Sequence, residues 1–182
     1  MKNKNEERIL LVNAKDEIQG FEEKLLVHKL GLLHRAFSIL IFNSKSEMLL
    51  QRRAFHKYHF GGLWSNACCG HQREKELLNE AVHRRMKEEL GFDCNLNKFF
   101  SFSYKTKFDS GLIENELDHV FIGISNDYPK INEEEASDYK WAHLDDIDRD
   151  IKKHPETYSY WFKIIMQEHV QIIKNFLAQK IN

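Results

Sequence analysis

The chain has 182 residues, of which 42% are hydrophobic and 12% aromatic, so it can bury a core and fold as a single domain over residues 1–182. Its 27 basic and 28 acidic residues leave a formal charge of −1, which does not supply the basic face that binds a nucleic-acid backbone. The composition therefore excludes a disordered chain, and we expect no nucleic-acid partner.

The sequence also argues against export and membrane insertion. Residues Met1 to Arg8 are polar and charged, unlike a signal peptide. The longest apolar run, Ala36 to Phe42, is too short for a membrane span of about 20 residues. The cysteines are 3 in number and lack the spacing of a disulfide framework, which suits a reducing compartment. We therefore expect a cytoplasmic protein without membrane contacts, and we expect it to be a monomer.

The first part of the chain predicts strands. A short hairpin is expected from Ile9 to Val12 and from Glu17 to Phe21. The β-branched and aromatic residues from Arg35 to Phe42 predict a buried strand, which pairs with Met48 to Arg52 across a polar turn. The segment from Arg53 to Asn66 follows no regular period, and a loop of this length in a compact domain is typically functional.

The second part of the chain predicts one internal helix, further strands and terminal helices. The helix is expected from Glu74 to Leu90, closed by Gly91. Strands are expected at Phe99–Lys105, Leu117–Ile124 and Tyr139–Ala142, and the acid-rich stretch Asn132–Asp150 is expected to be a solvated surface. The last helix has apolar positions at Tyr158, Trp161, Phe162, Ile165, Val170, Ile173, Phe176 and Leu177. This order predicts an α+β fold or a mixed α/β sandwich.

The internal helix carries the most specific pattern. Five residues lead from Gly70 to Glu76, seven more lead to Arg84, and Glu88, Glu89, Leu90, Gly91 and Phe92 follow at fixed positions. This pattern resembles the Nudix box, in which a loop and a helix present carboxylates to a divalent cation that holds a diphosphate. Arg85 stands where the box has a glutamate. The alternative is an ordinary surface helix with i,i+4 ion pairs.

Two short motifs flank the box. In an extended segment Cys69 and His71 face the same way, so both can line one cavity, whereas Cys68 points to the opposite side. Glu114 and Glu116 are likewise two residues apart, and two facing carboxylates repel unless a cation or a shared proton holds them. The alternatives are a buried, inert cysteine and a solvated strand edge.

Two further histidines can complete a metal site. His28 and His34 flank a turn expected at Gly31, and each alone is more typical of a surface or core histidine. With His71, Glu114 and Glu116 they form a set of three imidazoles and two carboxylates, which suits Mn, Zn or Fe better than Mg or Ca.

A basic loop precedes the cysteine motif. Arg52, Arg53 and Lys57 bring three permanent positive charges to it, beside His56 and His59, and such a cluster can hold a diphosphate through charge-assisted hydrogen bonds. The alternative is a solvated basic loop.

Together these motifs resemble the type 1 isopentenyl-diphosphate isomerases of the Nudix superfamily over nearly the whole chain. The matching segments are Leu33–Ser38, Gln51–Arg53, Trp64–His71, Gly111–Glu116 and Tyr158–Trp161, with Tyr104 between them. The resemblance implies a Nudix-type mixed β-sheet between helices, with an amino-terminal β-hairpin and carboxyl-terminal helices. It also implies an enzyme that interconverts isopentenyl diphosphate and dimethylallyl diphosphate by protonation and deprotonation.

The resemblance further implies a role for each motif residue. Cys69 and Glu116 would be the acid/base groups, supported by Tyr104. The transition metal, Mn²⁺ or Zn²⁺, would be bound by His28, His34, His71, Glu114 and Glu116, and Glu89 would help to hold a Mg²⁺ on the diphosphate. Arg53, Lys57 and Arg85 would contact the diphosphate, and Trp161 would face the hydrocarbon.

Two other functions remain open. A Nudix hydrolase acting on another organic diphosphate would keep the box but needs neither Cys69 nor the histidines nor Trp161. A non-enzymatic metal-dependent binding domain would show metal-linked stability without turnover.

Overall fold

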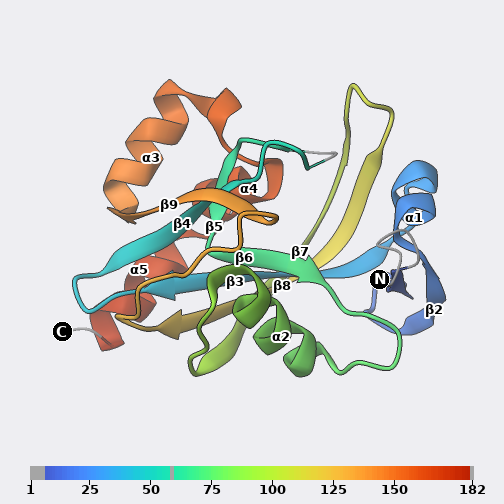
Figure 1. The fold of residues 1–182 in the computed structure, drawn as a ribbon, viewed down its shortest axis with the longest axis horizontal. Helices are drawn as coiled ribbons and strands as arrows, with labels where there is room; N and C mark the ends of the chain where they lie inside the picture. Colours follow the sequence, from blue (N-terminus) through green and yellow to red (C-terminus); the bar gives the residue numbers. More distant parts are fainter. Residues whose placement is uncertain (1–6, 58–59, 181–182) are drawn as a thin grey trace. The chain divides into compact units, whose positions relative to one another are not determined.

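The computed structural model describes residues 7–57 and 60–180. Along the chain run β1 (Arg8–Val12), β2 (Ile18–Glu23), α1 (Lys24–Leu30), β3 (His34–Phe42), β4 (Glu47–Arg53), β5 (Trp64–Asn66), β6 (Cys68–His71), α2 (Leu78–Leu90), β7 (Leu96–Lys107), β8 (Ile113–Ile124), β9 (Ala136–His143), α3 (Leu144–Lys153), α4 (Tyr160–Glu168) and α5 (Val170–Lys180), labelled in Figure 1. The predicted fold class is confirmed, with a mixed sheet, an amino-terminal strand pair and carboxyl-terminal helices.

The chain divides into two compact units. The first unit comprises Met1–Ser38, Cys69–Arg85 and Lys98–Phe121, and the second comprises Ile39–Cys68, Met86–Asn97 and Ile122–Asn182. Five elements, namely β3, β6, α2, β7 and β8, contribute residues to both units.

In the first unit, β1 pairs antiparallel with β2, as the predicted hairpin requires, and also with the start of β3. The Asn13 carboxamide oxygen closes the hairpin turn by accepting from the backbone N–H groups of Lys15 and Glu17. Leu10, Val12 and Leu117 form a buried cluster beside this strand pair. The helix α1 was not predicted from the sequence, because its seven residues are too few for a clear helical period.

The predicted helix begins later than expected, at Leu78 rather than Glu74. Lys75 has a φ of 67°, a left-handed conformation that no residue inside a right-handed helix adopts. Glu80 accepts a hydrogen bond from the backbone N–H of Leu77 at 2.9 Å and thereby caps the helix where it does begin.

In the second unit, β4 pairs antiparallel with the end of β3, with β5 and with β9. The segment after Arg53 is therefore not a loop throughout, because Trp64–Asn66 forms β5. The predictions for Met48–Arg52 and Tyr139–Ala142 are confirmed by β4 and β9.

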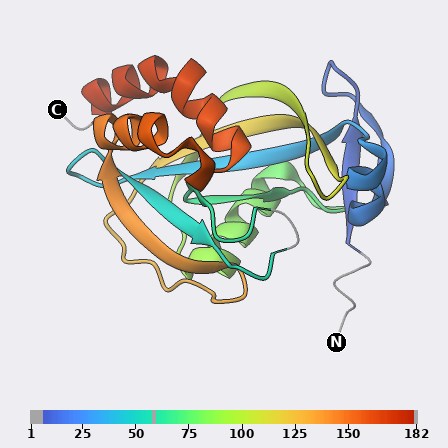
Figure 2. The ribbon, with the colours of Figure 1, turned by 90° about the horizontal axis from the view of Figure 1, so that it is seen from above.

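The carboxyl-terminal part of the second unit differs from its prediction in two places. The acid-rich stretch contains α3, which buries Leu144, Ile147 and Ile151 on one face, so it is not simply a solvated surface. The apolar helical pattern from Tyr158 to Leu177 is divided between two helices, α4 and α5, which are separated at His169. Figure 2 shows α3, in orange, and the redder helices α4 and α5, with α4 packed against both of the others. No helix in the described part of the chain has the length and apolar character needed to cross a membrane.

Candidate metal and acid/base site

Three elements bring the predicted histidines to one place within the first unit. His28 lies in the last turn of α1, His34 is the first residue of β3, and His71 is the last residue of β6. Between them Gly31 ends α1 with a φ of 64°, and a Cβ added there would lie 2.9 Å from the Ile113 side chain. The expected turn is therefore confirmed, and only glycine fits it.

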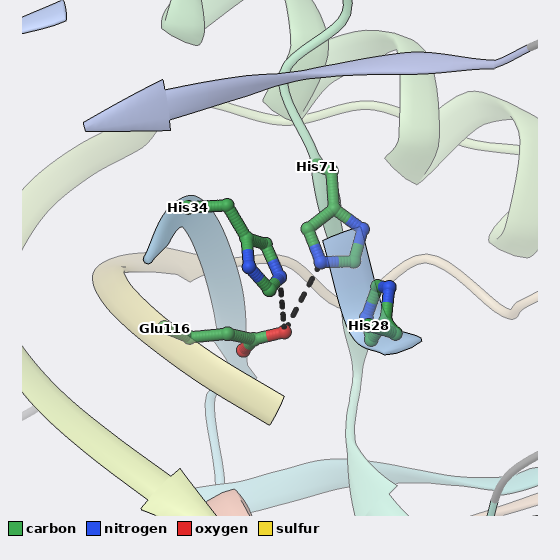
Figure 3. Close-up of side chains that lie close together, drawn as sticks. All are labelled: His28, His34, His71 and Glu116. Carbon is green, nitrogen blue, oxygen red and sulfur yellow. Dashed lines mark hydrogen bonds and ion pairs between the residues drawn. The ribbon is translucent and has the colours of Figure 1, made fainter. Parts of the chain in front are cut away.

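The imidazoles of His28, His34 and His71 converge on the carboxylate of Glu116. One ligand atom from each of these four residues lies within 4.8 Å of all the others. Figure 3 shows Glu116 Oε1 facing the Nε2 atoms of His71 and His34, at 3.1 Å and 3.3 Å. His28 and His34 are 1% and 0% exposed, so the alternative of surface histidines is wrong.

Backbone contacts determine which ring nitrogens carry protons. Nδ1 of His28 lies 2.6 Å from the Lys24 carbonyl oxygen, and Nδ1 of His34 lies 2.9 Å from that of Leu32. A carbonyl only accepts, so Nδ1 carries the proton in each ring and Nε2 carries a lone pair. The His34 lone pair faces a carboxylate oxygen, which is favourable only with a proton or a metal ion between them. The donor set therefore fits a divalent transition metal.

The charge states of the cluster suit this interpretation. Burial lowers the pKa of His28 to about 4 and the pKa of His71 to about 3, so both rings are neutral at neutral pH. Burial alone raises the pKa of Glu116, but a proton on the His34 or His71 nitrogen that faces the carboxylate outweighs burial and holds that pKa well below its usual range. Neutral imidazoles and an ionised carboxylate are the forms that bind metals.

Tyr104 links the cluster to the second predicted carboxylate. Its hydroxyl lies 2.7 Å from Glu116 Oε2 and 2.9 Å from Glu114 Oε2, so one proton is shared between both acceptors. Burial and then the Glu116 charge raise the pKa of Tyr104 well above its usual value, so it stays a donor. Glu114 and Glu116 are 2% and 6% exposed, and the solvated strand edge is therefore wrong.

Asp118 continues this row along β8 and was not predicted from the sequence. It is 1% exposed, and the Ser38 hydroxyl donates to its Oδ2 at 2.7 Å. Burial, followed by the Glu116 charge, raises the pKa of Asp118 to about 8. The alternation of acids at Glu114, Glu116 and Asp118 was the signal that could have revealed it.

The Nudix-box residues of the first unit have structural partners. Both carboxylate oxygens of Glu76 accept from Arg84, and Glu76 also accepts from the backbone N–H of Arg73 at 3.1 Å.

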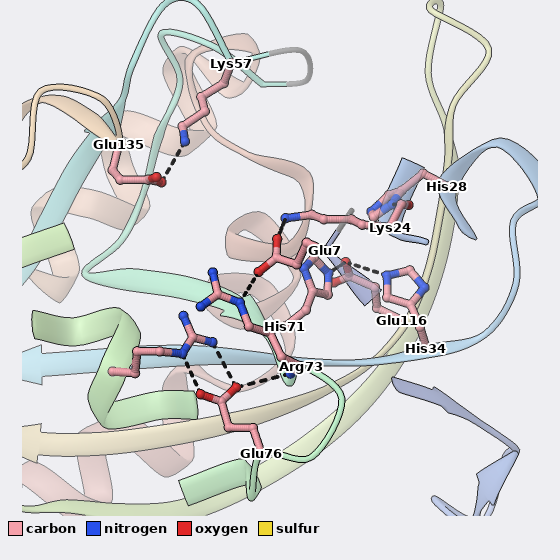
Figure 4. Close-up of polar contacts among 11 residues, drawn as sticks. Glu7, Lys24, His28, His34, Lys57, His71, Arg73, Glu76, Glu116 and Glu135 are labelled. Atoms are coloured by element: carbon pink, nitrogen blue, oxygen red, sulfur yellow. Dashed lines mark hydrogen bonds and ion pairs between the residues drawn. The ribbon is translucent and has the colours of Figure 1, made fainter. Parts of the chain in front are cut away.

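Figure 4 shows Arg73 and Lys24 on either side of Glu7. Burial raises the pKa of Glu7, but these two cations outweigh it and lower that pKa to about 2.

The cysteine motif forms β6, and its two thiols differ in burial. Cys68 is fully buried, as the strand alternation predicted, whereas Cys69 is partly exposed. Gly70 between Cys69 and His71 is tightly packed, because an added Cβ would lie 3.1 Å from Phe37 and 3.2 Å from Arg85. Arg85, which replaces the box glutamate, therefore lies against this strand.

The other predicted site residues belong to the second unit. The Arg53 guanidinium lies 5.4 Å from the ring centre of Trp161. Lys57 pairs with Glu135 at 2.6 Å, as Figure 4 shows. Glu89 is 3% exposed and accepts a hydrogen bond from Gln51 at 2.8 Å. Of the basic loop, His59 lies outside the described residues.

Comparisons with known proteins agree with these features. The NUDIX domain family model matches residues 32–163. Isopentenyl-diphosphate Delta-isomerase 2 of Aromatoleum aromaticum is 52% identical over 86% of this chain and 82% of that protein. The protein of the same name from Photorhabdus laumondii is 48% identical over 88% of this chain and 91% of that protein. The crystal structure of a MutT protein from Methanosarcina mazei has a TM-score of 0.63 at 23% identity, covering 78% of this chain and 96% of that one.

The fold and the matching family model define a Nudix-domain protein. Within that superfamily, the chain belongs to the isopentenyl-diphosphate Delta-isomerases, an enzyme family, because it shares about half of its residues with two of them over most of its length. These relatives favour an isomerase over a Nudix hydrolase.

Proposed function

We propose that this enzyme interconverts isopentenyl diphosphate and dimethylallyl diphosphate by adding a proton to one carbon of the substrate and removing a proton from another. The observation that carries the proposal is the buried convergence of His28, His34, His71 and Glu116, with the Tyr104 hydroxyl on the same carboxylate. Substrate and product are isomers, so the reaction needs no redox cofactor.

Cys69 and Glu116 are the proposed acid/base pair. Glu116 is ionised, so it can accept a proton from carbon. It is also buried, which keeps water away from the reacting group. Tyr104 keeps its own proton and orients the carboxylate by donating to Oε2. The thiol of Cys69 precedes His71 by two residues on β6, and this side chain is partly exposed.

We assign the binding of a transition metal, Mn²⁺ or Zn²⁺, to His28, His34, His71, Glu114 and Glu116. When bound, this metal would neutralise the two buried carboxylates and fix the geometry of Glu116. Glu89 is the proposed ligand for Mg²⁺, which would accompany the substrate diphosphate. Glu89 is a buried carboxylate on the Nudix-box helix, and this location supports the assignment.

The substrate is proposed to span cationic and aromatic groups. Arg53, Lys57 and Arg85 would contact the diphosphate, and Trp161 would face the hydrocarbon. The proximity of Arg53 to the indole supports this assignment, because it places a permanent cation beside an apolar surface. A carbocation formed from an alkene is stabilised by an aromatic ring face and destroyed by water, so a dry indole suits the reaction.

We also propose that the chain acts as a single domain and as a cytoplasmic monomer, with neither nucleic-acid nor membrane partners. The single domain is supported by the family match over residues 32–163 and by the five elements that contribute to both units.

The test is incubation of the purified protein with isopentenyl diphosphate and Mg²⁺ in heavy water. We expect dimethylallyl diphosphate as product and solvent deuterium in both recovered isomers. Turnover without deuterium would contradict acid/base transfer. Release of phosphate or pyrophosphate without the isomer would instead support the hydrolase, and a metal-dependent rise in melting temperature without any turnover would support a binding domain.

A further inference from the structure

A fully buried group of polar side chains lies in the second unit, between β5 and the start of α4. Ser65, Asn66 and Ser159 are each 0% exposed, and the indole of Trp161 is 4% exposed. Buried polar groups are costly unless their hydrogen bonds are satisfied, so the directions of these bonds define the arrangement.

The orientation of the Asn66 carboxamide follows from its neighbours. Its Nδ2 lies 3.2 Å from the Ile39 carbonyl and 2.6 Å from the Cys68 carbonyl, and both of these groups only accept. Its Oδ1 therefore faces the two remaining donors, the Trp161 Nε1–H and the Ser65 hydroxyl, each at 2.9 Å. No other orientation satisfies all four contacts.

The chain of bonds continues into α4. The Ser65 hydroxyl donates to Asn66, so it accepts from the Ser159 hydroxyl at 3.0 Å. The backbone N–H of Ser159 donates to the Trp64 carbonyl at 2.9 Å. The start of α4 is thus joined to β5 two residues before Trp161.

The faces of the indole have their own neighbours. The Arg53 guanidinium lies 5.4 Å from the ring centre, and the Phe60 ring meets it edge-on at 5.2 Å. Neither contact determines which edge of the indole points inward. That choice depends on the one directional bond the indole makes, from Nε1 to Asn66.

We propose that Asn66 is the positioning residue for Trp161, holding the indole plane in the orientation that the carbon skeleton of the substrate meets. The proposal rests on the proposed function, which assigns Trp161 to the hydrocarbon. Asn66 also holds the Cys68 carbonyl, whose peptide bond leads directly to the Cys69 nitrogen. One side chain thereby holds both the indole and the backbone that precedes the acid/base thiol.

The first test separates positioning from general stability. Asn66→Ala is expected to lower kcat about tenfold or more, because small misplacements of reacting groups cost that much, with KM changed far less. Ser65→Ala is the matched control, since it removes a bond to the same Oδ1 without touching the indole. We expect Ser65→Ala to lower the melting temperature while kcat stays within about threefold of wild type. Equal losses of kcat in both variants would overturn the proposal.

A double-mutant cycle tests whether Asn66 acts through the indole. Trp161→Phe keeps an aromatic ring but has no N–H donor. In that background we expect Asn66→Ala to lower kcat by less than about threefold, so the two effects do not add. Full additivity would refute action through the indole.

A measurement on the unmutated protein does not depend on activity or on the folding of a variant. The Trp161 indole N–H should exchange with heavy water far more slowly than an exposed indole, as followed by nitrogen-15 NMR, because it is buried and bonded. Exchange at the rate of an exposed indole would refute the positioning role. A protected indole in a protein that makes no isomer would instead refute the proposed function and leave the Asn66–Trp161 contact intact.

Discussion

The proton that Asp118 holds should be visible in the pH dependence of stability. The metal-free protein, kept in a chelator, is compared with Asp118→Asn between about pH 7.5 and about pH 5.5. The variant keeps the shape of the side chain and an oxygen that can accept from Ser38, but it cannot titrate. Asp109→Asn, an exposed change between β7 and β8, is the matched control.

The histidines of the cluster oppose stability as the pH falls. The pKa of His28 is lowered to about 4 and the pKa of His71 to about 3, whereas the unfolded chain titrates near 6.5. Across this range the unfolded chain therefore binds more protons than the folded one, and acid favours unfolding. Each ring costs roughly 1 to 2 kcal/mol between the two pH values, and together they cost about 3 kcal/mol.

Asp118 has the opposite sign. Its folded pKa is raised to about 8 from 3.8, so the folded protein binds a proton that the unfolded chain lacks. As the pH falls over the same range, this proton stabilises the folded state by roughly 2 to 3 kcal/mol. In the wild-type protein the two effects nearly cancel. Burial also lowers the pKa of His119, and its contribution adds to the acid-side loss equally in both proteins.

The expected result is therefore a difference between two proteins. Urea unfolding followed by circular dichroism should show Asp118→Asn losing roughly 2 to 3 kcal/mol more than wild type on going to the lower pH. Asp109→Asn should follow the wild-type curve. Parallel curves for wild type and Asp118→Asn would refute the conclusion that the folded protein holds a proton on Asp118.

Three further outcomes are expected. His71→Ala should lose most of its transition metal on dialysis, because the metal loses one of its five proposed ligands; unchanged metal content by elemental analysis would contradict the proposed metal site. Cys69→Ala should lower kcat by at least ~10²-fold, whereas Cys68→Ala, a change at a fully buried side chain, should cost stability and leave kcat within about threefold; the reverse pattern would overturn the assignment. Glu135→Gln should lower KM for the diphosphate, because Lys57 no longer has to leave an ion pair of 2.6 Å; a raised KM would contradict this competition.

Much of the chemistry of the chain was readable from sequence because spacing along one element fixes which side chains share a face. Glu114 and Glu116 had to face the same way on a strand, and they do, with Tyr104 donating to both. The burial of Cys68 followed from the same alternation. The β1–β2 hairpin and the buried strand β3 were predicted by turn residues and β-branched runs, which act locally.

Other features could not be read from the pattern of residue types along the chain. The late start of α2 reflects the left-handed Lys75 and the cap from Glu80, while α3 is recognisable only once its apolar stripe has a surface to pack against. The break at His169 lies within an apolar pattern that looks continuous in the sequence.

The state of the candidate site was decided by tertiary structure alone. Residue types suggested that His28, His34, His71 and Glu116 could meet, but their pKa values depend on burial and on neighbours from other elements. Asp118 shows the difference most clearly. Its place in the row of alternating acids is a property of the sequence, whereas its proton depends on burial beside the Glu116 charge. Desolvation is a property of the folded environment, and no local pattern encodes it.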